Sequence, residues 1–134
     1  MPEEHSEPYF DKASNRGFTH FRNAARFSAR GFVEAYRREA AFRQELAVLL
    51  VLTPLAVWMS RTFLDFIALM AVAGFVLTVE LVNSGIEATV DRIGRDHHEL
   101  AGLAKDYGSA AVMMSLIVAG IVWLTFLVRR LYGL

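Results

Sequence analysis

Three long apolar stretches dominate the distribution of hydrophobic residues along the chain. They carry no charged residue and cover residues 46–59, 66–79 and 108–128. At about 1.5 Å per residue, the third is long enough to cross a hydrocarbon core roughly 30 Å thick, and the first two reach that length only with helical flanks. A soluble protein can bury one such helix, but three in so short a chain leave too little polar surface to cover them. The pattern therefore predicts transmembrane helices at about residues 40–60, 62–84 and 107–129.

A different pattern precedes these stretches. Residues 17–38 form, at helical spacing, an apolar side and a basic side. The apolar side consists of Phe18, Phe21, Ala25, Phe32 and Tyr36. The basic side consists of Arg22, Arg26, Arg30 and Arg37. Such a helix suits the membrane interface, with aromatic rings in the acyl boundary and arginines among anionic headgroups. The alternative is a soluble helix packed on a partner. Residues 1–16 do not resemble a signal peptide, and we expect a disordered tail before a single domain of residues 17–134.

The connections between the apolar stretches predict the topology. Residues 59–63 are a minimal link, so the first two transmembrane helices should form an antiparallel hairpin, and the third helix returns after the polar stretch 91–107. Eight Lys and Arg residues precede the first uncharged stretch, residues 46–59, and three lie in the second connection, against three on the other side. The positive-inside rule then places the N-terminus in the cytoplasm and the C-terminus on the opposite side.

Composition narrows the chemistry. The 134 residues are 54% hydrophobic and contain no cysteine, which excludes disulfides, thiolate metal sites and a cysteine nucleophile. The net charge is zero, so nothing indicates nucleic-acid binding. The phosphate-binding loop, the dinucleotide fingerprint and the soluble protein-kinase signatures are also absent from the sequence.

The most informative polar residues lie at the end of the second predicted span. Glu80, Asn83, Glu87 and Asp91 are spaced i, i+3, i+7 and i+11, so all four share one helical face. A carboxylate at the depth of Glu80 is costly unless it is paired, protonated or functional. The structural alternative is a polar packing stripe in which Asn83 bonds to a neighbouring helix. Four polar residues on one face exceed what packing requires, which favours a functional site.

Glu39, at the start of the first span, is a second candidate. It could simply pair with Arg43 at i+4, but we expect it at the same membrane level as Glu87. Two carboxylates from different helices can hold a Mg²⁺ ion that also binds nucleotide phosphates.

The second connection adds Asp96, His97, His98, Lys105 and Asp106. Adjacent histidines cannot share one helical face, which disfavours zinc. A nucleotide-binding rim is more plausible, with Lys105 near phosphate and Asp106 near a ribose hydroxyl. The alternative is a solvated loop with a Lys105–Asp106 pair.

Three motifs carry a family resemblance: residues 39–45 read EAAFRQE, residues 80–94 read ELVNSGIEATVDRIG, and residues 98–111 read HELAGLAKDYGSAA. Over about residues 17–127 the chain resembles the bacterial membrane-embedded diacylglycerol kinases. That resemblance implies an all-α homotrimer in the bacterial cytoplasmic membrane, each protomer having three transmembrane helices and an interfacial helix. It further implies transfer of the γ-phosphate of MgATP to diacylglycerol, giving phosphatidic acid.

The resemblance also implies residue roles. Glu80 is the expected general base, and Glu39 and Glu87 are the expected metal-bridging carboxylates. Asn83 and Ser109 match positions near the lipid substrate. The implied nucleotide contacts are Glu39, Glu87, Asp96, His97, His98, Lys105 and Asp106, with His20 and Phe27 in the N-terminal helix. His20, Phe27 and Ala29 depart from the family pattern, which expects an arginine, a tyrosine and a tryptophan there.

Two other functions remain compatible with the residues. A polyprenol kinase acting on undecaprenol would share the Glu and Asn motif, although residues 105–111 favour the diacylglycerol branch. A small proton-coupled transporter would use Glu80 as an intramembrane proton carrier, but it has no evident use for Glu87 and Lys105.

Overall fold

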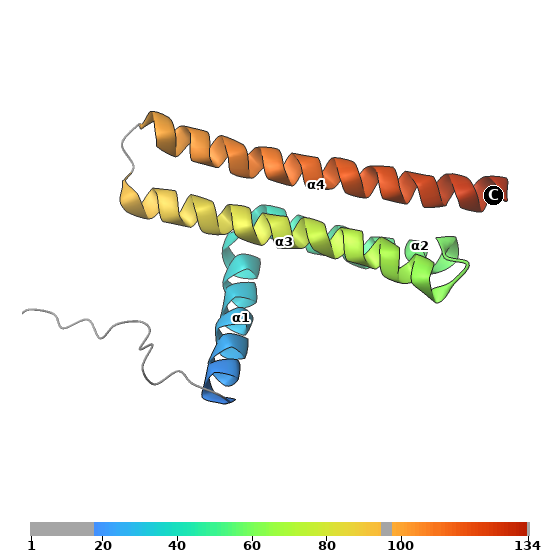
Figure 1. Ribbon diagram of the computed structural model, residues 1–134, viewed down its shortest axis with the longest axis horizontal. Coiled ribbons are helices and arrows are strands. Elements are labelled where there is room, and N and C mark those ends of the chain that lie inside the picture. Colours follow the sequence, from blue (N-terminus) through green and yellow to red (C-terminus); the bar gives the residue numbers. More distant parts are fainter. Residues whose placement is uncertain (1–17, 95–97, 134) are drawn as a thin grey trace, which may run out of the picture. The chain divides into compact units, whose positions relative to one another are not determined.

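The computed structural model describes residues 18–94 and 98–133, and every element of regular secondary structure in those residues is a helix. Figure 1 shows the four helices in chain order. The chain divides into two compact units, Met1–Glu34 and Ala35–Leu134, which are treated separately below. The predicted tail, residues 1–16, lies outside the described residues.

Helix α1 spans Phe18–Arg38, so the helix predicted for residues 17–38 is present. Its aromatic side chains are largely exposed: Phe21 is 72% exposed, and Phe32 and Tyr36 are also solvent-accessible. Within the helix, the Arg26 guanidinium lies over the Phe27 ring, 5.7 Å from its centroid. The placement of α1 at a membrane surface stays a prediction.

Three further helices have the length and apolarity to cross a membrane: α2 (Ala40–Met59), α3 (Phe63–Ile93) and α4 (Glu99–Tyr132). The chain is therefore an all-helical, multi-pass membrane protein. At about 1.5 Å per residue, α3 is roughly 46 Å long and α4 roughly 51 Å, so both exceed a hydrocarbon core of about 30 Å. Their polar ends thus continue as helix beyond the apolar stretches, and residues 99–107 are the first turns of α4 rather than a loop.

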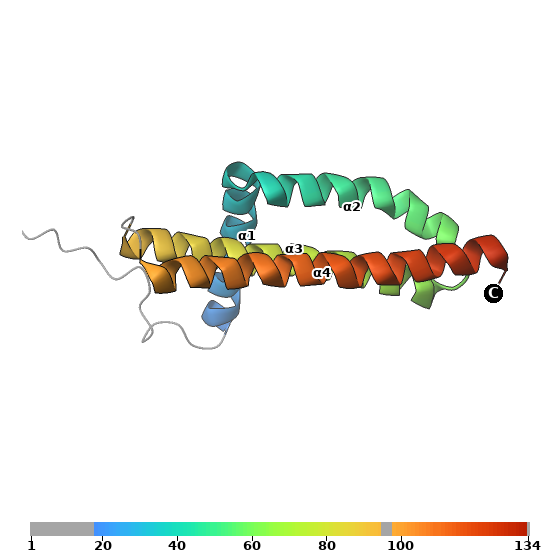
Figure 2. The same cartoon turned by 90° about the horizontal axis from the view of Figure 1, so that it is seen from above.

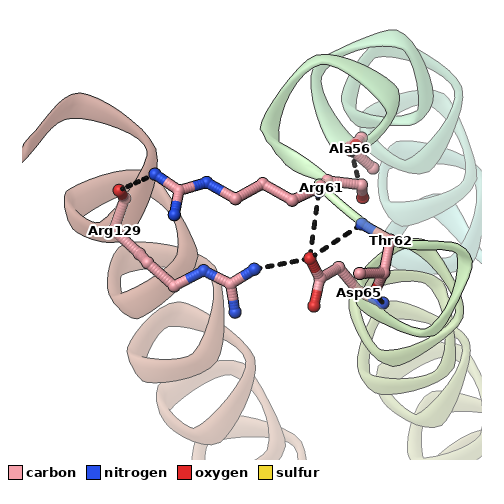
Figure 3. Close-up of polar contacts among 6 residues, drawn as sticks. Ala56, Arg61, Thr62, Asp65 and Arg129 are labelled. Atoms are coloured by element: carbon pink, nitrogen blue, oxygen red, sulfur yellow. Dashed lines mark hydrogen bonds and ion pairs between the residues drawn. The ribbon is translucent and has the colours of Figure 1, made fainter. Parts of the chain in front are cut away.

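The α2–α3 hairpin is held by one carboxylate (Figure 3). Thr62 and Asp65 form a capping box at the start of α3, in which Asp65 N donates to Thr62 Oγ1 and Asp65 Oδ2 accepts from Thr62 N at 3.1 Å. The same Oδ2 accepts from Arg61 N at 2.9 Å and from Arg129 Nη2 at 2.5 Å. Arg61 Nη2 in turn donates to the Arg129 carbonyl at 3.1 Å. The predicted hairpin and the last turns of α4 therefore lie at the same end of the bundle.

Helices α3 and α4 lie side by side along most of their length (Figures 1 and 2). Near the hairpin, Ala56, Met59 and Leu69 form a buried cluster. Partly buried side chains pack against that cluster, namely Phe66, Met70, Val122, Trp123, Phe126 and Leu127. Packing is thus tight at the hairpin end of the bundle.

Towards its N-terminus, α2 separates from the other two helices (Figure 2). Pro54 lies inside α2, where a proline removes a backbone hydrogen bond and favours a bend. A mostly apolar cavity of about 510 Å³ lies between the three helices, and its lining extends from Gln44 to Met59 on α2 and from Leu116 to Leu127 on α4.

The buried cluster makes a prediction about stability. Leu69 is fully buried, so Leu69→Ala should lower the free energy of unfolding by roughly 2 kcal/mol, mainly through the cavity that it leaves. Leu64→Ala, on the same helix but 77% exposed, should have little effect, because lipid replaces the lost contacts. Unfolding of both variants in detergent by titrated denaturant measures the difference. Equal losses in the two variants would contradict this account of the core.

Candidate functional site

Glu80 is a buried carboxyl side chain on a mostly apolar helix. It is 5% exposed, and α3 presents it on the same face as the buried Leu69, Val76 and Asn83. Glu39 and Glu87 lie close enough to Glu80 to interact with it electrostatically. The structure therefore brings together the three carboxylates that the sequence singled out, from the N-cap of α2 and from two positions on α3.

Asn83 occupies the next turn of the same face. It is 8% exposed, and its Nδ2 donates to Glu87 Oε1 at 3.1 Å. The packing-stripe alternative required a bond from Asn83 to another helix, whereas this bond stays within α3. On the other side of the amide lies Gly108 of α4.

Lys105 crosses from α4 to α3. Its Nζ lies 2.6 Å from Asp91 Oδ1, so the ion pair joins the two helices rather than Lys105 and its sequence neighbour Asp106. The pair lies outside the apolar stretch 108–128. The hydrogen bond that Lys105 donates to Asp91 raises the pKa of the Lys105 ammonium above its usual value, so Lys105 is cationic at any physiological pH. A cation is thereby held about three turns beyond the buried Glu80 along α3.

His98 has a structural task. It is the N-cap of α4, where its Nδ1 accepts from Leu100 N at 3.2 Å. An accepting Nδ1 leaves Nε2 as the N–H donor of a neutral imidazole. Beside it, Val90, Ile93, Gly94, Leu100 and Ala104 line a second cavity of about 480 Å³.

The remaining predicted residues are less constrained. Asp106 and Ser109 are exposed on α4. His20 and Phe27 lie on α1, in the first compact unit, and their roles stay predictions. Asp96 and His97 lie outside the described residues.

The predicted Mg²⁺ site can be compared with the donors present. Among residues 18–94 and 98–133, no three His, Asp or Glu side chains are grouped so as to hold a metal ion. Glu39 and Glu87 nevertheless supply hard carboxylate oxygens, and Mg²⁺ bound with a nucleotide needs only one or two of these beside phosphates and water. Arg43 does not compete for Glu39, because its Nη1 donates to the carbonyls of Tyr36 and Arg37 at 3.1 and 3.2 Å.

Two residues near the site carry no role in the sequence pattern. Glu45 interacts electrostatically with Glu80, and its Oε2 is buried with no hydrogen-bond partner in the described part of the chain. The sequence offered one signal for it: Glu45 is a carboxylate immediately before the uncharged stretch 46–59. Asp91, noted only as the last member of the polar face, is the partner of Lys105.

The fold and the carboxylate cluster define a class: a small multi-pass membrane protein whose acidic site lies at the boundary between an apolar helix bundle and its polar end. The sequence profile of the family Prokaryotic diacylglycerol kinase matches residues 26–127. The chain belongs to this family.

Individual relatives agree with that assignment. The chain is similar to the diacylglycerol kinase of Escherichia coli strain K12, at 46% identity over 80% of this chain and 88% of the relative. It is 41% identical to the diacylglycerol kinase of Haemophilus influenzae, over 80% of this chain and 91% of the relative. It is 42% identical to that of Pseudomonas aeruginosa, over 83% of this chain and 90% of the relative.

Proposed function

We propose that this chain transfers the γ-phosphate of MgATP to the primary hydroxyl of diacylglycerol and so makes phosphatidic acid. The observation that carries the proposal is the burial of Glu80 beside Glu39 and Glu87 in a chain of this family. A kinase site accounts for Glu80 and Glu87 on one face of the otherwise apolar α3, and the N-cap of α2 adds Glu39 to them.

The polar end of α3 and α4 suits a nucleotide. Lys105 supplies a cation for phosphate oxygens, and the His98 Nε2–H is free of the N-cap bond. The apolar walls of the cavity beside His98, formed by Val90, Ile93 and Leu100, suit a planar base. Asp106 is exposed about two turns along α4 from the His98 N-cap and would accept from a ribose hydroxyl. Bound Mg²⁺ would be held by Glu39 and Glu87, and it would offset charge on the phosphates.

The cavity between α2, α3 and α4 suits the lipid. Its lining is almost wholly aliphatic, as acyl chains require, and it reaches Glu45 beside the carboxylate cluster. Trp123 also lines it, at the hairpin end where it packs against the buried cluster, and its indole Nε1 is buried without an acceptor in the described residues. A lipid with its chains in this cavity would place its headgroup end near Glu80.

The transfer then needs few protein groups. Glu80 takes the proton of the lipid hydroxyl while the hydroxyl oxygen forms a bond to the γ-phosphorus. The bond from that phosphorus to the β–γ bridging oxygen breaks, and ADP leaves. Asn83 holds Glu87 through its amide. Lys105 stabilises negative charge on the phosphates, and the surrounding apolar helices exclude water that would otherwise compete as acceptor.

The orientation proposed from the sequence fits this division of roles. If the N-terminus and residues 91–107 lie on the cytoplasmic side of a bacterial inner membrane, the polar ends of α3 and α4 that would bind the nucleotide face cytoplasmic MgATP. The hairpin with Arg61 and Arg129 then faces the other side of the membrane.

One assay tests the function and the base together. Purified protein in mixed micelles with labelled MgATP should phosphorylate diacylglycerol in preference to undecaprenol. Glu80→Gln keeps the shape but cannot accept the proton, so turnover should fall at least roughly hundredfold while MgATP still binds. Preference for undecaprenol would make the chain a polyprenol kinase, and failure to consume ATP would favour a transporter. Near-normal turnover of the variant would leave the reaction with another base, Asp106 being the next candidate.

The metal assignment makes a separate prediction. Glu39→Gln and Glu87→Gln should each raise the Mg²⁺ concentration needed for half-maximal activity by roughly tenfold or more, because each removes one charged ligand. Glu99→Gln, a carboxylate at the exposed start of α4, serves as the control and should behave as the parent. Unchanged Mg²⁺ dependence in both site variants would remove these carboxylates from the metal.

The homotrimer is not required to cover the polar face of α3, since a single chain already buries Glu80 and Asn83. The family resemblance alone therefore supports the trimer, with the site shared between protomers. Crosslinking in native membranes should show three chains in the active fraction, and activity confined to monomer would exclude this assembly.

A further inference from the structure

The helix α4 touches the carboxylate face of α3 through a residue with no side chain. Gly108 is buried, and a Cβ added to it would lie 2.1 Å from Asn83 Oδ1 and 3.2 Å from Asn83 Cγ. The first distance is far below van der Waals contact, so no other residue type fits at this position while Asn83 keeps its conformation. Gly74, Gly102 and Gly120, on the same two helices, have no neighbour within 4 Å of such an atom.

The amide of Asn83 is consequently held from two sides. Its Nδ2 donates to Glu87 Oε1 at 3.1 Å, and its Oδ1 points towards Gly108 with no hydrogen-bond donor among the described residues. A carboxylate accepts only, so Glu87 dictates which end of the amide faces it. The Oδ1 must then face α4, and only the glycine leaves room for it. The Cα–H of Gly108 is the weak donor that such a close approach offers.

From this arrangement we infer that Gly108 is a positioning residue for Glu87, acting through the Asn83 amide. Without the space at Gly108, the amide rotates and withdraws its N–H from Glu87, and the carboxylate loses the contact that fixes its orientation. The inference rests on the proposed function, in which Glu87 binds Mg²⁺ with ATP. Outer-shell contacts of this kind typically change metal affinity by about 10- to 100-fold when they are removed.

The test compares Gly108→Ala with Gly74→Ala, a matched glycine with open space around it. Gly108→Ala should raise the Mg²⁺ concentration for half-maximal activity roughly tenfold or more while kcat at saturating MgATP falls much less, because Glu80 is untouched. Gly74→Ala should leave both values at the parental level. Parental Mg²⁺ dependence in Gly108→Ala would overturn the inference.

A double variant separates this role from simple helix packing. Asn83→Ala removes the amide and also makes room for a Cβ at position 108, so adding Gly108→Ala to it should cause no further loss. If Gly108→Ala alone fails to assemble, the double variant should assemble and show the Mg²⁺ dependence of Asn83→Ala. A double variant that multiplies the two losses, or that does not assemble, would show that Gly108 acts on the backbone contact of α3 with α4 and not through the amide.

A readout independent of catalysis distinguishes this inference from the proposed function. The sequence has three asparagines, so the side-chain amide signals of ¹⁵N-asparagine-labelled protein can be assigned. Glu87→Gln should shift the Asn83 amide signal in the parent, where the bond exists, and leave it nearly unchanged in the Gly108→Ala background. Equal shifts in both backgrounds would overturn the inference even if the kinase activity is confirmed.

Discussion

The burial of Glu80 and Asn83 in an otherwise apolar helix is the constraint on which the rest of the structure depends. Polar groups at membrane depth are costly when they face hydrocarbon, so α3 must cover this face with other helices. The cover comes from α2 and α4 of the same chain, and both side chains are less than a tenth exposed. Helix α4 approaches α3 very closely at this point, because Gly108 has no side chain that would displace Asn83.

Two ion pairs at opposite ends of α3 secure this contact. Asp65 bonds to Arg129 near the hairpin, and Asp91 bonds to Lys105 near the connection to α4. They are 26 residues apart on α3, about 39 Å along a helix, so each fixes one end of the α3–α4 pair. Neither is a surface pair between neighbouring turns. Both join α3 to α4 in the same register, the one in which Gly108 meets Asn83.

The same arrangement of α3 and α4 places one site between the aqueous phase and the membrane lipid. Beyond the buried Glu80, Lys105 and His98 belong to polar helix ends that are longer than the membrane requires. The apolar cavity lies between α2 and the α3–α4 pair, and it reaches Met59 in the buried cluster at the hairpin end. A reaction between a water-soluble nucleotide and a membrane lipid requires a site of this kind, with the reacting groups where the two environments meet.

Local pattern alone determined the helices and the faces they present. Uncharged runs long enough to cross a bilayer must be helical there, because no water satisfies their backbone groups, and a period of 3.6 residues aligned Glu80, Asn83, Glu87 and Asp91 before any fold was known. The motifs pointed to the family that the comparisons then confirmed.

The tertiary structure alone decided which side chains meet across helices. It paired Lys105 with Asp91 instead of Asp106, brought Glu45 to Glu80, and seated Gly108 against Asn83. It also buried Glu80 within one chain. The physical reason is that helix periodicity sets direction within one helix, whereas contacts between helices depend on the volume and shape of side chains far apart in sequence.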